Sequence, residues 1–208
     1  MDKSYWNNFY ASDSNNLSIA LPSQFCLFAL GETSGIKNII DFGTGNGRDA
    51  FYFAQNGKRV LALDASISAI EENTELAKKR DLHSFVSFQR FEVGTDQPED
   101  INIFDEPKSI YARFFLHSLT NSLLEEFAEV SSNLLSKGEI LLVEYRNSKD
   151  ESRQKVFDGH FRNYIDQEKL CILFNKFGLK KTYGVDGLGY AKYKDDDAYV
   201  SRNIFQKK

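Results

Sequence analysis

The sequence predicts an α/β fold: a doubly wound, mostly parallel sheet with helices on both faces and an antiparallel hairpin at its C-terminal end. Three observations lead to this prediction. Short apolar runs typical of buried strands alternate with amphipathic helical segments through most of the chain. A glycine-rich turn joins the first such run directly to a helix. The last two strand-like runs have no helix between them, which favours a closing hairpin.

We expect the elements in the following order within a single domain, residues 1–208. Residues 1–30 precede the first strand and form a helical cap, in which Pro22 suits a helix start. Strands are expected near residues 39–41, 58–66, 85–93, 109–119 (with the exit loop), 139–145, 180–185 and 199–205. Helices are expected over residues 49–55, 67–80, 121–136 and 167–177. Residues 146–165 show little apolar periodicity and form a loop or insertion on the substrate side, and the run Asp195–Asp197 reads as a solvated turn.

The composition excludes several classes of protein. The net charge of −4 argues against a nucleic-acid partner. No apolar run reaches the length of a membrane span, so no membrane association is expected. The N-terminus is polar and lacks the apolar stretch of a signal peptide, which together with only two cysteines favours a cytoplasmic location. The cysteines have no metal-binding spacing, so no metal is expected.

The glycine-rich turn follows an apolar run that ends in Asp41. Gly43, Gly45 and Gly47 alternate with other residues, and without a Cβ they let the backbone turn tightly and a ligand approach it closely. A dinucleotide-binding fingerprint would place its third glycine one position later, where the chain has Arg48. A carboxylate at Asp41 would also repel the phosphates of a dinucleotide, so an NAD-dependent oxidoreductase is the weakest alternative. A bare turn without a ligand is the structural alternative.

The second expected strand ends at Asp64, about 20 residues after the glycines, a spacing at which an acidic residue accepts hydrogen bonds from ribose hydroxyls. The alternative is that Asp64 or Ser66 simply caps the next helix. The glycine turn upstream favours the ribose role.

The pattern D-x-G-x-G-x-G resembles motif I of the class I S-adenosylmethionine-dependent methyltransferases. This resemblance implies a Rossmann-like seven-stranded sheet in the order 3-2-1-4-5-7-6 and S-adenosyl-L-methionine as cofactor. It also implies that the glycine loop wraps the methionine part, that Asp41 reaches toward the amino group, and that Glu92 faces the adenine amino group. The expected cofactor-binding residues are Asp41, Gly43, Gly45, Gly47, Arg48, Asp64, Ala65, Glu92 and Arg113.

Three further stretches resemble a small-molecule subgroup that includes tellurite-resistance, thiopurine-type and surface-polysaccharide-cluster methyltransferases. They are Tyr111–His117, Gly47–Ala50, and Gly189–Tyr193 with Asp197 and Arg202. One departure concerns the end of the fourth strand, where N-methyltransferases of the Asp-Pro-Pro-Tyr type carry acidic residues. The chain has Phe114 and Phe115 there, which argues against an amide or adenine nitrogen as the methyl acceptor.

The substrate should face the ends of the fourth and fifth strands, beside the cofactor. Because a sulfonium methyl is already activated, the protein mainly aligns the nucleophile and removes its proton. His117 is the first candidate for a general base and His160 the second, although His117 can equally be structural. Guanidinium groups suit an anionic acceptor, although Arg113 can instead be structural or bind the cofactor. The expected substrate-binding residues are Tyr10, Gln24, Arg113, Tyr145, Arg146 and Arg162.

The leading hypothesis is methyl transfer to a hydroxyl of a small polar, anionic metabolite, such as a sugar, a nucleotide-sugar or a phosphorylated precursor. A link to a bacterial surface glycan (capsule or polysaccharide biosynthesis) follows only from the resemblance. The alternatives are an S-, N- or metalloid methyltransferase of detoxification type, or a non-catalytic cofactor-binding partner subunit. The sequence leaves open the acceptor molecule and atom, and whether the protein is a monomer or a homodimer.

Overall fold

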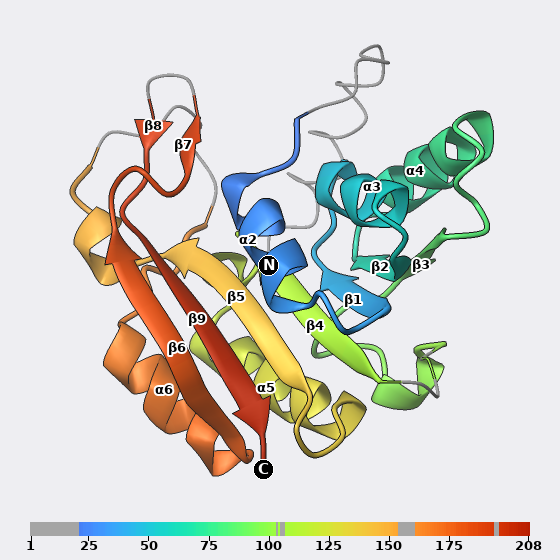
Figure 1. Ribbon diagram of the computed structural model, residues 1–208. Coiled ribbons are helices and arrows are strands. Elements are labelled where there is room, and N and C mark those ends of the chain that lie inside the picture. The colour runs from blue at the N-terminus through green and yellow to red at the C-terminus, as the bar shows by residue number, and fades with distance from the viewer. Residues whose placement is uncertain (1–20, 103, 105–106, 154–160, 194–195) are drawn as a thin grey trace.

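The computed structural model describes residues 21–102, 104, 107–153, 161–193 and 196–208 (Figure 1). Most of the predicted N-terminal cap, including Tyr10, lies outside the described residues, and so does His160. Seven strands form one sheet in the order β3-β2-β1-β4-β5-β9-β6, which confirms the predicted fold class. Their bounds are β1 Asn38–Phe42, β2 Arg59–Asp64, β3 Val86–Arg90, β4 Lys108–Arg113, β5 Ile140–Arg146, β6 Leu179–Gly187 and β9 Val200–Lys207.

The first five strands are parallel, and β9 runs antiparallel between β5 and β6. The closing hairpin is therefore as predicted, but its connection carries a further two-stranded pair, β7 (Lys192–Tyr193) with β8 (Asp196–Asp197). The expected solvated turn at Asp195–Asp197 is wrong for Asp196, which is buried. Its carboxylate neutralises a buried arginine, as described below.

Helices cover both faces of the sheet. Helix α2 (Gln24–Glu32), α3 (Arg48–Gln55) and α4 (Ile67–Lys79) lie in front of the strands in Figure 1, and α5 (Asn121–Leu134) and α6 (Gln167–Lys176) lie behind them. Alternate residues of β1 serve the two layers: Ile39 packs with the first group of helices and Ile40 with the second. The central strands are buried on both faces, which explains their continuous apolar runs.

The alternation of strands and α-helices is interrupted between β3 and β4. Between β3 and β4 the described residues form one turn of 3-10 helix, Pro98–Asp100, rather than an α-helix. This stretch is rich in acidic residues and has few apolar ones to bury against the sheet. None of the helices in the described part of the chain is long and apolar enough to cross a membrane.

The order of the strands determines where a ligand can bind. The chain moves outward from β1 through β2 to β3, then returns to place β4 on the other side of β1. The crevice at the carboxyl ends of β1 and β4 is the switch point at which open α/β sheets bind ligands. The glycine turn follows β1 directly, so it lies at this crevice.

Candidate active site

The glycine loop between β1 and α3 has a backbone that side chains would disturb. Gly43, Gly45 and Gly47 all adopt positive φ angles, of 71°, 55° and 70°. A Cβ on Gly43 would lie 2.5 Å from Cδ2 of Phe115, and one on Gly47 would lie 2.7 Å from Oδ1 of Asn73. Because Gly47 has no side chain to cap α3, the start of that helix keeps its positive dipole end facing the crevice.

Asp41 lies on β1 immediately before the loop and is only 3 % exposed. Burial, together with the nearby carboxylates of Asp49 and Asp64, raises the pKa of Asp41 to about 8. A bound cation would reverse this effect by favouring the charged form. The site therefore fits the ammonium group of an amino-acid ligand.

Asp64 ends β2 and binds the glycine loop itself. Its Oδ2 accepts the backbone N–H of Gly45 at 2.9 Å, and its Oδ1 accepts the N–H of Ser66 at 2.9 Å. Burial raises the pKa of Asp64, although these backbone hydrogen bonds oppose the shift. Helix α4 is capped by Ser66, whose Oγ accepts the N–H of Ala69. The capping alternative thus applies to Ser66, and Asp64 keeps lone pairs for further donors such as a ribose diol.

Ala65 and Glu92 are two further residues that are predicted to bind the cofactor. Ala65 is half-buried directly after Asp64. Glu92 is buried two residues beyond the end of β3 and forms an ion pair of 3.0 Å with Arg90. Arg90 also donates hydrogen bonds to Asp96, so Glu92 has a cation and a second carboxylate close to it.

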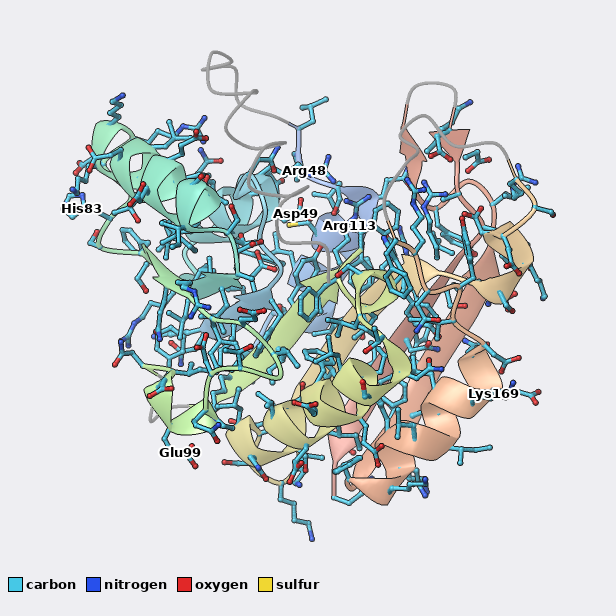
Figure 2. The ribbon with its side chains drawn as sticks, turned by 180° about the vertical axis from the view of Figure 1, so that it is seen from behind. Arg48, Asp49, His83, Glu99, Arg113 and Lys169 are labelled. Carbon is cyan, nitrogen blue, oxygen red and sulfur yellow. The ribbon has the colours of Figure 1, made fainter. Side chains whose placement is uncertain are left out.

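Figure 2 shows Arg48, Asp49 and Arg113 gathered at the carboxyl end of the sheet, far from His83 and Lys169 at the periphery. Arg48 is the first residue of α3, and its Nε lies 3.5 Å from Oδ1 of Asp49. Arg113 is the last residue of β4. Residues from two elements far apart in the sequence thus meet at the switch point.

Arg113 belongs to a buried ionic row across three strands. Arg113 of β4, Glu144 of β5 and Arg202 of β9 are register partners. The fully buried Glu144 accepts from Arg113 Nε at 2.9 Å and from Arg202 Nε at 2.7 Å. Burial raises the pKa of Glu144, and the two guanidinium groups oppose the shift. Two cations share one anion, so the row carries an excess of one positive charge.

Phe114 follows Arg113 and has a positive φ of 53°, which is rare for a bulky side chain. The guanidinium of Arg113 lies 4.3 Å from the centre of the Phe114 ring. The backbone of Phe114 is held by its N–H, which donates to the carbonyl of Glu144. Strained residues of this kind persist where the surrounding structure determines them, often at functional sites.

Arg146 ends β5 but already has two carboxylate partners. Its Nη1 lies 2.5 Å from Asp150 and its Nη2 lies 2.5 Å from Asp196. Burial alone would lower the pKa of Arg146, but Asp196 and Asp150 raise it. Arg153 also lies 3.8 Å from Asp150, so two cations and two anions balance here, whereas the row at Arg113 has one cation in excess. This arrangement argues against the predicted role of Arg146 in binding an acceptor anion.

His117 is buried in a 3-10 turn, Leu116–Ser118, that begins two residues beyond the end of β4. Its Nδ1 accepts the backbone N–H of Arg146 at 3.4 Å, so a neutral ring carries its proton on Nε2. In this form His117 presents an N–H and not a free lone pair. The His117 carbonyl accepts the N–H of Asn163, which brings the half-buried Arg162 to the same region.

The other predicted substrate residues occupy different surroundings. Tyr145 is fully buried, and its hydroxyl donates to Oδ1 of Asn203 at 2.8 Å, so the proposed site does not include it. Gln24 begins α2, and with its amide nitrogen turned toward the hairpin it donates to the carbonyls of Gly189 and Tyr190. Within the described residues, no group of His, Cys, Asp and Glu side chains is arranged to hold a metal ion.

The structure also reveals residues that the site prediction omitted. In the sequence, Asp49 stood out only as part of the loop exit that follows Gly47. Nothing in the sequence indicated that Ser23 and Tyr111 are its hydrogen-bond partners. Glu144 could have been suspected, because it is the one acidic residue inside the apolar run from Ile140 to Tyr145.

A glycine loop at the switch point of this sheet, with acids at the ends of the first two strands, defines a Rossmann-like S-adenosylmethionine-dependent methyltransferase. Residues 18–183 match the family described as methyltransferase domain, and the chain belongs to this family. It is an enzyme class whose cofactor is S-adenosyl-L-methionine.

Solved structures share the fold at low sequence identity. A methyltransferase from Anabaena variabilis is 18 % identical, with a TM-score of 0.75 over 99 % of this chain and 93 % of that one. A protein studied for the conversion of a disulfide bond into a thioacetal group in echinomycin biosynthesis is 18 % identical, with a TM-score of 0.75 over 100 % and 94 %. Magnesium protoporphyrin IX methyltransferase from Synechocystis, with S-adenosylhomocysteine bound, is 12 % identical, with a TM-score of 0.67 over 89 % and 83 %. No curated protein matches the sequence.

Proposed function

We propose that the protein transfers a methyl group from S-adenosyl-L-methionine to a hydroxyl of a small polar, anionic metabolite. The observation that carries the anionic part is the excess positive charge of Arg113, Glu144 and Arg202 beside the switch point. A sugar, a nucleotide-sugar or a phosphorylated precursor fits this description. The link to surface glycans has no support beyond the resemblance in the sequence.

The cofactor would be held by residues at the ends of the first three strands. Asp41 would accept from its amino group, Asp64 with Ala65 would hold the ribose, and Glu92 would face the adenine amino group. When bound, the cofactor supplies a methyl group already activated on a sulfonium centre. The chain's own contribution is then to orient the acceptor and to take up or direct its proton.

The acceptor's anionic group would bind at Arg113. The Nε of Arg113 is engaged by Glu144, and 17 % of its side chain is exposed, so the acceptor would bind the other nitrogens of its guanidinium group. Arg113 thus differs from Arg146, which has two carboxylate partners of its own. Arg162, which is brought to the same region by Asn163, would be the second contact.

Two histidines are candidates for taking the proton of the acceptor hydroxyl. The bond from the Arg146 N–H to Nδ1 of His117 means that a neutral His117 ring carries its proton on Nε2. His117 acts as a base only after that tautomer changes. His160, outside the described residues, is the other candidate base.

The proton on Nε2 of His117 favours a second candidate function, which is methyl transfer to a thiolate or another soft nucleophile of detoxification type. Such an acceptor is already deprotonated and needs no base. Replacing His117 and His160 together with Asn distinguishes the two. Near-full turnover of the true acceptor in this double variant contradicts a histidine base and favours the thiolate, whereas a loss of about 100-fold in kcat supports hydroxyl chemistry.

The direct experiment screens acidic and neutral sugars, nucleotide-sugars and thiols for release of S-adenosylhomocysteine.

Once an active acceptor is known, Arg113→Gln should raise the KM for that acceptor about tenfold or more while leaving the Kd of the cofactor within about twofold. Lys149→Gln is the matched control, because Lys149 is an exposed cation paired with Asp186. An unchanged KM contradicts the anionic acceptor. If the Kd of the cofactor rises instead, Arg113 binds the cofactor carboxylate. Absence of any cofactor binding would support a non-catalytic partner subunit.

We further propose a cytoplasmic enzyme that acts as a monomer or homodimer. A single domain over residues 1–208, with residues 1–30 as a cap and 146–165 as a substrate-side insertion, remains the expected organisation. Analytical ultracentrifugation with and without cofactor tests the oligomeric state.

A further inference from the structure

Asp49 joins three elements through one buried carboxylate. Its Oδ1 accepts the backbone N–H of Ser23 at 2.8 Å, and its Oδ2 accepts the hydroxyls of Ser23 at 2.7 Å and of Tyr111 at 2.8 Å. Asp49 is 7 % exposed, Ser23 6 % and Tyr111 1 %. The carboxylate therefore connects the start of α3 to the start of α2 and to the middle of β4.

All three of these groups are donors, which explains why the position holds an acid. A carboxylate accepts at both oxygens, whereas an asparagine would place an NH₂ group against one of the donors. The hydroxyl of Ser23 also caps α2 by accepting the N–H of Cys26 at 2.9 Å. A neutral isostere at position 49 would thus disturb both the junction and the cap.

The junction lies next to the residues expected to hold the cofactor. Asp49 is two residues beyond Gly47, in the first turn of α3. Tyr111 is the register partner of Asp41 on the neighbouring strand, and the ring of Phe25 from α2 stacks on it with 5.0 Å between centroids. Besides the apolar packing of α3 against α2 and β4, Asp49 fixes the end of the glycine loop to both elements by hydrogen bonds.

We propose that Asp49 is a positioning residue for the methionine end of the cofactor, acting through the end of the glycine loop without touching the cofactor. The inference rests on the proposed placement of the methionine part at this loop and is independent of the acceptor. Under this proposal, Asp49 affects binding of the methionine end of the cofactor. The ribose and the adenine are expected to contact residues at the ends of β2 and β3.

The experiment measures the Kd of two probes by calorimetry. S-adenosylhomocysteine carries the amino-acid part, and 5′-methylthioadenosine lacks it. We expect Asp49→Asn to weaken S-adenosylhomocysteine at least tenfold and to leave 5′-methylthioadenosine within about twofold. Failure of the wild-type protein to bind either probe would count against the proposed placement, which keeps that failure distinct from a failure of Asp49.

Lys58→Met is the matched control for a general loosening of α2. Lys58 is buried, and its Nζ donates to the carbonyls of Thr33 and Ile36 at 2.6 Å each, beyond the opposite end of α2. This variant should lower Tm without changing the ratio of the two Kd values. An equal change of that ratio in Lys58→Met, or equal weakening of both probes by Asp49→Asn, contradicts the proposal.

Gentler variants keep the test informative if Asp49→Asn does not fold. Tyr111→Phe removes one donor and keeps the ring, and Ser23→Ala removes another. Each should shift the ratio of the two Kd values in the same direction by about two- to fivefold, and Ser23→Thr, which keeps a hydroxyl, should restore it. Unchanged ratios in both variants would overturn the role assigned to Asp49.

Discussion

The carboxylate of Asp64 at the end of β2 accepts a hydrogen bond of 2.9 Å from the backbone N–H of Gly45. From the other side, Nδ2 of Asn73 in α4 donates to the carbonyl of Gly45 at 2.8 Å. Both polar groups of this one residue are thus held by neighbouring elements. The loop is shaped before a ligand arrives, which reduces the entropy lost on binding.

Asp41 should make stability and cofactor affinity depend on pH in opposite directions. Its folded pKa of about 8 lies above the value of about 4 in an unfolded chain, so between these values the folded state binds more protons. This contribution to stability is fully present below about pH 4 and is lost as pH rises to about 8. Binding of the cofactor's ammonium needs the charged carboxylate, so cofactor binding near pH 7 should release up to about one proton.

Asp41→Asn tests both parts of this prediction. The gain in Tm of the variant over wild type, without cofactor, should grow between pH 5 and pH 8, because the neutral amide avoids the buried charge. Cofactor affinity should fall by about 100-fold or more, since a charge-assisted bond is lost. Calorimetry in buffers of different ionisation enthalpy measures the proton release. A constant Tm difference across this range contradicts the assigned pKa shift.

Gly43→Ala should destabilise the protein by about 2 kcal/mol or more and abolish cofactor binding. The positive φ of Gly43 and its closeness to Phe115 leave no space for a methyl group. Gly31→Ala is the control: Gly31 lies in α2 with nothing within 4 Å of the added Cβ, so it should be neutral or stabilising by about 0.5–1 kcal/mol. Chemical denaturation measures both. Equal effects at the two sites would contradict the special geometry of the loop.

Glu144→Gln should destabilise the protein by about 3–5 kcal/mol, because it leaves the guanidinium groups of Arg113 and Arg202 without their shared anion. Glu75→Gln removes an exposed partner of Lys78 and should leave the midpoint of urea unfolding unchanged. A small effect at Glu144 would indicate that the two arginines of the buried row do not depend on their shared anion.

Replacing Phe114 with Gly and with Ala isolates the strain of its backbone. Both variants lose the ring, but only glycine adopts the φ of 53° without a penalty. The glycine variant should therefore be more stable than the alanine variant by about 1 kcal/mol. At Leu27, within helix α2, the same pair should show the opposite order. The reverse result at Phe114 would mean that its backbone relaxes when the ring is removed.

Most of the sheet could be predicted because its signals are local. Buried parallel strands are short apolar runs, and the helices begin at residues such as Ser66 and Asp166 that cap them through their own side chains. The order of the strands came from the resemblance, since periodicity does not show which strands pair. The run between β3 and β4 departed from the alternation because it lacks the apolar face that an α-helix needs.

The chemical partners in the site could not be predicted in the same way. Arg113 and Arg146 have the same local signal, an arginine at the end of an apolar strand, yet one shares a single carboxylate and the other holds two. The difference arises because Asp196 approaches from a hairpin that is distant in the sequence. The tautomer of His117 likewise depends on a backbone N–H from β5.

By itself, the sequence determined the elements, the glycine loop with Asp41 and Asp64, and the class of enzyme, because these features lie in short stretches whose backbone and burial are set by neighbouring residues. Only the tertiary structure decided how the charges pair and that Asp49 joins α2, α3 and β4. Such contacts join residues tens of positions apart, and strand register and helix packing alone bring them within hydrogen-bonding distance.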